Sequence, residues 1–157
     1  MLRWRGRIGL GAAVAVLGCA LAAAAVRGDH VLYVGGTLPL PEHTMGRLDL
    51  AGPAAEFLAA KGGAAFTIPY QGVESLEYGE KVGRRLGAAL AVSPLFLLSH
   101  KRRHFVTLTF KDARGATQGA VLEIGKHDVH TVLAAFSERS HVTVVYQSAE
   151  ARADAAK

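Results

Sequence analysis

The sequence predicts an α+β fold, in which an antiparallel sheet packs against one amphipathic helix. The first observation is a hairpin: residues 104–110 alternate apolar and polar side chains, turn residues occupy 111–115, and the alternation resumes over 120–124. The second is a helical stripe directly after it, because four apolar residues recur at positions i, i+3, i+4 and i+7. Those residues are Val129, Val132, Leu133 and Phe136.

The chain before this hairpin is interpreted as short strands separated by turns. Gly35 and Gly36 end the first strand, two prolines mark 37–44 as a loop, and Lys-Gly-Gly at 61–63 suits a tight hairpin turn. Pro69 lacks an amide donor, so its strand ends there or lies at a sheet edge. The strands are expected at 31–34, 46–50, 54–60, 64–69 and 73–78.

The segments on either side of the hairpin have a different character. Over 81–99, glycine and alanine replace β-branched residues, so we expect one or two short helical pieces. The helix with the apolar stripe is expected to have Asp128 as its cap and to end near 139–140. A last strand is expected at 142–146, and the polar, alanine-rich residues 147–157 are expected to form a flexible tail.

The first 28 residues have the composition of an export leader. Three arginines and no acidic residue occupy 1–7, and 8–26 is an uninterrupted run of apolar or small residues. Small residues at 22–25 suit cleavage, which favours a cleaved signal peptide and a periplasmic or secreted domain. The run is also long enough for an uncleaved membrane anchor. The stretch VLGC resembles a lipobox and makes Cys19 a candidate for lipidation.

Residues 29–146 are expected to form one domain, because this length supports a single hydrophobic core. Cys19 is the only cysteine of the chain, so this domain has no disulfide. The net charge of +5 is concentrated at the start. Of the 18 basic residues, four lie in or beside the leader, which leaves 14 against 13 acidic residues. The domain is therefore nearly neutral, and we expect no nucleic-acid partner.

Seven histidines raise the question of a metal site. His127 and His130 lie off the apolar stripe of the helix, and His100 and His104 flank the basic residues 101–103, which repel a cation. The sequence contains no HExxH, no Cys/His cluster, no GxSxG and no phosphate-binding glycine loop. We therefore expect no metal, no cofactor and no catalytic residue, and keep an unrecognised hydrolase as the third functional hypothesis.

Basic residues bracket the apolar segment 86–98. The candidate anionic-ligand patch consists of Arg84, Arg85, Lys101, Arg102 and Arg103. This composition is typical of a segment that lies on an anionic membrane surface, and the segment is too short to span a bilayer, which needs about 20 residues. The favoured alternative is that its leucines pack under the sheet. In that case the basic residues are its solvated ends. We expect the five basic residues to lie near one another, and Glu74, Glu77 and Glu80 are the nearest acidic residues in the sequence that could pair with them.

The stretch IPYQGVESLEYG, at 68–79, resembles the strand-turn-strand of bacterial PH-like and GRAM-like domains. FVTLTFKDARG, at 105–115, and the amphipathic helix after it resemble the same family. The resemblance covers roughly 46–139 and implies a bent antiparallel barrel or sheet closed at one end by the helix. The apolar segment 86–98 and the strand after the helix depart from the family pattern.

PH-like domains bind lipids, peptides or proteins, so the fold alone does not select a function. We expect a non-catalytic binding or scaffolding domain that is exported to the bacterial cell envelope, with an unknown protein or an anionic lipid as its partner. The alternative is a peripheral binder of anionic membranes that uses residues 81–103.

Cleavage of the leader predicts a mature N-terminus between Ala23 and Asp29, which N-terminal sequencing after subcellular fractionation will measure. Recovery of intact Met1 in the membrane fraction would indicate an anchor instead. Incorporation of a labelled fatty acid that is lost in Cys19→Ser would establish the lipoprotein alternative.

Overall fold

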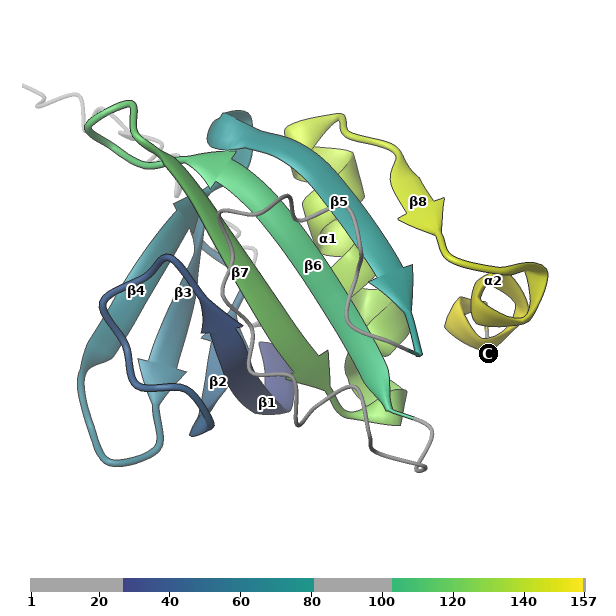
Figure 1. Ribbon diagram of the computed structural model, residues 1–157, viewed down its shortest axis with the longest axis horizontal. Helices are drawn as coiled ribbons and strands as arrows, with labels where there is room; N and C mark the ends of the chain where they lie inside the picture. The colour runs from purple at the N-terminus through teal and green to yellow at the C-terminus, as the bar shows by residue number, and fades with distance from the viewer. Residues whose placement is uncertain (1–26, 81–102, 157) are drawn as a thin grey trace, which may run out of the picture.

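The computed structural model describes residues 27–80 and 103–156, which form an α+β fold (Figure 1). The leader up to residue 26, with Cys19, and the segment 81–102 lie outside the described residues. The strands are β1 (Arg27–Gly36), β2 (Thr44–Asp49), β3 (Ala54–Ala59), β4 (Ala64–Pro69), β5 (Val73–Gly79), β6 (His104–Lys111), β7 (Thr117–Ile124) and β8 (Val144–Tyr146). The helices are α1 (Val129–Ser140) and α2 (Ala149–Ala155), with 3-10 turns η1 (Tyr70–Gly72) and η3 (Lys126–Asp128). Within these two ranges, no helix has the length and apolar character needed to cross a membrane.

The eight strands form one sheet in the order β4-β3-β2-β1-β7-β6-β5-β8. Two antiparallel meanders, β1–β4 and β5–β7, are joined by the antiparallel pairing of β1 with β7. Figure 1 shows β3 and β4 running at a steep angle to β5 and β6. The sheet does not close, because β4 and β8 are its two edges. Of the two expected forms, barrel or sheet, the open sheet is therefore the one observed.

The helix α1 packs against β1, β5 and η1 and lies behind β5 and β6 in Figure 1. Val129, Val132, Leu133 and Phe136 are all buried, which confirms the predicted apolar stripe. Phe136 is completely buried where this stripe meets the sheet. The strands contribute the rest of the core, including the stacked rings of Phe57 and Phe66, whose centroids are 4.8 Å apart.

A cluster of polar and aromatic contacts holds α1 where the chain passes from β4 to β5. Tyr70, in η1, packs edge-on against Phe136, with ring centroids 5.5 Å apart. The Tyr70 hydroxyl donates to the carbonyl oxygen of Leu50 at 3.1 Å. The Arg139 guanidinium lies 5.1 Å from the centre of the Tyr70 ring and donates to the carbonyl oxygens of Leu50 and Gly52. These contacts join the helix to both meanders at the corner that strand pairing leaves open.

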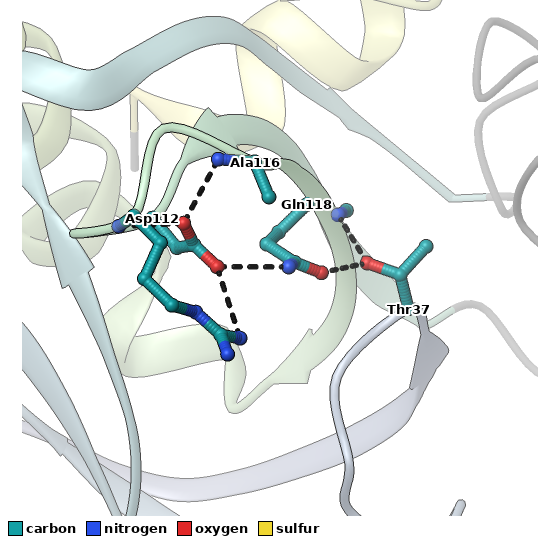
Figure 2. Close-up of polar contacts among 6 residues, drawn as sticks. Thr37, Asp112, Ala116 and Gln118 are labelled. Atoms are coloured by element: carbon teal, nitrogen blue, oxygen red, sulfur yellow. Dashed lines mark hydrogen bonds and ion pairs between the residues drawn. The ribbon is translucent and has the colours of Figure 1, made fainter.

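The predicted hairpin is confirmed as β6 and β7, and its turn is held by the polar network in Figure 2. Asp112 accepts hydrogen bonds from the backbone N–H of Ala116 and from the Gln118 amide, which lies 3.0 Å away. The hydrogen bond from Gln118, with two backbone N–H donors, lowers the pKa of Asp112. Gln118 in turn accepts from the Thr37 hydroxyl at 2.5 Å. The network ties the turn to the end of β1 and is structural, since its polar atoms satisfy one another.

The structure differs from the sequence prediction at three places. β1 begins at Arg27, inside the expected leader, and its polar start carries a register shift between Gly28 and Val31. Asp128 occupies the cap position of α1, but its side chain makes no capping hydrogen bond because η3 precedes the helix.

The third difference lies in the expected flexible tail, where the residues after β8 form the helix α2. The Ser148 hydroxyl accepts from the Ala151 N–H at 3.1 Å and caps this helix. Ala151 and Ala155 are buried against the rest of the domain. The polar composition of residues 147–157 predicts a flexible tail, but the burial of two alanines and the Ser148 cap accompany a helix there.

Phe136→Ala should lower the free energy of unfolding by about 3–5 kcal/mol, because it removes a buried ring and leaves a cavity. Denaturant unfolding of the full chain will measure this cost. Met45→Ala is the control, since Met45 is half exposed and its truncation should change stability by about 0.5 kcal/mol or less. Similar small costs for both variants would contradict the role assigned to α1.

Candidate functional site

The predicted basic patch falls largely on residues that the structure does not describe. Arg84, Arg85, Lys101 and Arg102 lie outside the described ranges, and only Arg103 is described. Its guanidinium lies 2.8 Å from the carboxylate of Glu123, its diagonal neighbour on β7. Glu123 is 20 residues away in the sequence and becomes the partner of Arg103 through the pairing of β6 with β7.

Glu74 and Glu77, which the sequence offers as partners for the patch, contact other side chains. Glu74 lies 3.3 Å from the ammonium group of Lys111, and both side chains are about half exposed, so this pair contributes little to stability. Glu77 accepts a hydrogen bond of 3.0 Å from the amide of Gln147, just after β8. Glu77 thus helps to hold the C-terminal segment on the sheet.

The described histidines, cysteines and carboxylates include no group of three that could hold a metal ion. His127 and His130 are both exposed, His127 in η3 and His130 on the first turn of α1. Their spacing alone therefore builds no site in the described part of the chain.

A groove of about 250 Å³ lies between α1, β8 and α2. Its lining combines the buried apolar residues Leu133 and Ala155 with the exposed polar residues His130 and Glu138. The volume is just below the range of pockets that enclose small molecules, and it suits a few side chains of a partner. The lining residues are His130, Leu133, Ala134, Ser137 and Glu138 from α1, Val144 and Tyr146 from β8, and Ala155 from α2.

A larger hollow of about 440 Å³ lies over β2, β3 and the turn between β3 and β4. Glycine and alanine make most of its lining, and Arg47 is its one charged side chain. The groove beside β8 offers more varied chemistry, with aromatic, aliphatic, hydroxyl, imidazole and carboxylate groups. We therefore take the groove as the candidate site.

An aromatic cluster fixes the β8 wall of the groove. Tyr146 packs edge-on against Tyr78 of β5, with ring centroids 6.2 Å apart. The Arg152 guanidinium of α2 lies 5.1 Å from the centre of the Tyr146 ring. On the other side of the cluster, the Tyr78 hydroxyl is 2.6 Å from Nδ1 of His104. The cluster thus anchors both β8 and α2 to the sheet.

Burial, together with the nearby carboxylates of Asp154 and Glu80, raises the pKa of Tyr78 to about 12. A phenol with this pKa stays neutral at physiological pH. The Tyr78 hydroxyl beside His104 is therefore not ionised, and it supplies no phenolate nucleophile or base.

The groove runs beside an edge of the sheet, because β8 has β5 on one side and is last in the strand order. The backbone N–H of Gln147 donates to the Tyr78 carbonyl oxygen at 3.0 Å. Alternate residues of a strand direct their N–H and C=O groups to the same side, so Val145 also faces β5. The backbone groups of Val144 and Tyr146 then face away from the sheet.

No family model matches the chain, and no similar curated protein was found. The sequence predicts both the strand at 142–146 and the helix α1, which form two walls of the groove. It does not predict the third wall, because Ala151 and Ala155 give α2 no large apolar residue to reveal its buried face.

Tyr78→Phe should remove part of the pH dependence of stability. The neutral phenol is favoured in the folded protein, so its contribution is complete below the unfolded pKa of about 10 and is lost as the pH rises toward 12. A shift of this size corresponds to about 3 kcal/mol at most. The free energy of unfolding of the wild type should therefore fall relative to that of Tyr78→Phe between pH 10 and 12. Parallel curves over this interval would show that Tyr78 is not the group responsible.

Proposed function

We propose that the protein is an exported, non-catalytic binding domain of the cell envelope, and that the groove between α1, β8 and α2 receives a segment of a partner protein. The observation that carries this proposal is the groove itself, in which buried apolar and exposed polar residues lie together beside an edge strand of the sheet. Small apolar recesses of this kind hold side chains that anchor a partner.

Export is supported by the composition of the leader, with its basic start and long apolar run. β1 begins at Arg27, directly after that run. A retained leader would therefore hold the domain close to the membrane, and a cleaved one would release it into the compartment beyond.

A PH-like architecture is part of the proposal. It is supported by the antiparallel strands and the following helix α1 within residues 46–139, since the resemblance implies antiparallel strands closed at one end by a helix. β8 and α2 come after this unit, and they supply one side of the groove. The binding site would then be an addition to the common fold.

The groove also contains a serine, a histidine and a glutamate, the residue types of a hydrolase triad. His130 and Ser137 are two turns apart on α1, which separates their backbones by about 10 Å. The Ser137 hydroxyl donates to the Val142 carbonyl oxygen at 2.9 Å, just past the helix end. A nucleophile and its base must lie within hydrogen-bond reach, so this set favours binding over hydrolysis.

Panning a random peptide phage library on the immobilised full chain tests the proposal. The wild type should enrich peptides, and Ala134→Arg, which fills the groove, should weaken their binding by about tenfold or more, since an apolar anchor is displaced. Ala113→Arg, the same change in the exposed β6–β7 turn, should leave binding unaltered. No enrichment, or equal binding by Ala134→Arg, would overturn the proposal.

Vesicles of anionic lipid at low salt test the alternative on the same full-length protein. A membrane-surface function would be favoured if the wild type binds these vesicles and a variant with Arg102 and Arg103 both changed to Glu does not. The leader is present in both forms, so its own affinity for lipid cancels in the comparison.

A further inference from the structure

We infer that the partner binds as an added strand on the free edge of β8, as an extended peptide whose alternate side chains enter the groove. This inference rests on the proposed function, and it specifies the binding mode and the chemistry of the partner. Strand addition is a common way for a sheet edge to recognise an extended segment, with main-chain hydrogen bonds for affinity and pockets for specificity.

The edge of β8 has backbone groups available for such pairing. The backbone groups of Val145 and the N–H of Gln147 point toward β5. Val144 and Tyr146 therefore each direct a backbone N–H and a C=O away from β5. Beyond β8 the sheet order contains no further strand among the described residues. A peptide that pairs there would satisfy the same groups in the geometry of a regular ladder.

The two edges of the sheet differ in how they are protected. β4 has a register shift opposite Phe57 and Leu58, and it ends in Pro69. Bulges and prolines both discourage the addition of another strand. β8 is Val-Val-Tyr, with no charge and no proline. Val145 is 38% exposed and is one of two large apolar side chains exposed in the described part of the chain. The β8 edge therefore has the composition of a strand that accepts a neighbour.

The groove gives an added strand its side-chain specificity. Val144 and Tyr146 both line the groove, so alternation places Val145 on the opposite face. A strand paired with β8 continues this pleat and directs every second side chain toward Leu133 and Ala134. The recess of about 250 Å³ limits these to one or two apolar side chains.

Charge at the rim suggests what flanks the apolar residue. Glu138 is the one carboxylate among the groove-lining residues, and it is exposed. It favours a lysine or arginine beside the apolar anchor. A second copy of this chain is a poorer partner, because a three-residue edge pairs too little surface for a stable dimer, which buries well over 1,000 Å².

The test uses synthetic copies of the phage-selected peptides and the full chain, with affinity measured by fluorescence polarisation. Methylation of single peptide nitrogens should weaken binding by about tenfold at every second position and leave the positions between unaffected. On the protein, Val144→Pro removes an N–H that faces away from β5, at the first position of a strand where proline is tolerated. It should weaken binding by about the same factor with an unchanged Tm.

Glu138→Lys should weaken the binding of peptides with a basic residue. Glu56→Lys makes the same change at an exposed position of β3 and should not weaken it. Insensitivity to N-methylation, with binding still lost in Ala134→Arg, would overturn strand addition and leave the groove as the site. A failure to select any peptide would overturn the proposed function itself. A concentration-dependent dimer that Val144→Pro abolishes would replace the peptide with a second copy of the chain. If Val144→Pro does not fold, the N-methylation pattern alone decides.

Discussion

The fold depends on how α1 closes the corner that the sheet leaves open. β4 and β5 are joined by the short turn η1, yet they do not pair, so backbone hydrogen bonds cannot seal the interior there. Side chains seal it instead: Phe136 and Tyr70 exclude water, and Arg139 satisfies carbonyl groups of the loop after β2. Because the apolar faces of both meanders meet beneath this contact, the position of the helix determines the position of the rest of the core.

The candidate site follows from the same helix. α1 uses one face for the core and leaves an adjacent face for the groove, and Leu133 contributes to both. The aromatic contacts of Tyr146 with Tyr78 and Arg152 then fix the β8 wall against the sheet. A site built in this way has walls that are positioned by contacts with the core.

The sequence was informative wherever large apolar residues follow a period. The alternation in β6 and β7 and the stripe of α1 predicted those elements correctly, because each buries one regular face. The start of β1 and the whole of α2 were missed, since polar residues and alanines have no such period. The pairing of Arg103 with Glu123 and the groove depend on which strands become neighbours, and sequence distance does not contain that information. The other four residues of the basic patch lie outside the described part of the chain, so their grouping stays a prediction.

The junction between β1 and β7 has a consequence for the order in which the protein folds. Each meander joins strands that are close along the chain, but Leu32 of β1 meets Glu123 of β7. Contacts between such distant residues form late, because the intervening chain must first be brought together at an entropic cost. During synthesis, the first meander therefore emerges with β1 paired to β2 on one side and exposed on the side that later receives β7. Until β7 arrives, that exposed strand is the point at which the nascent chain is most open to misassociation and to capture by a chaperone.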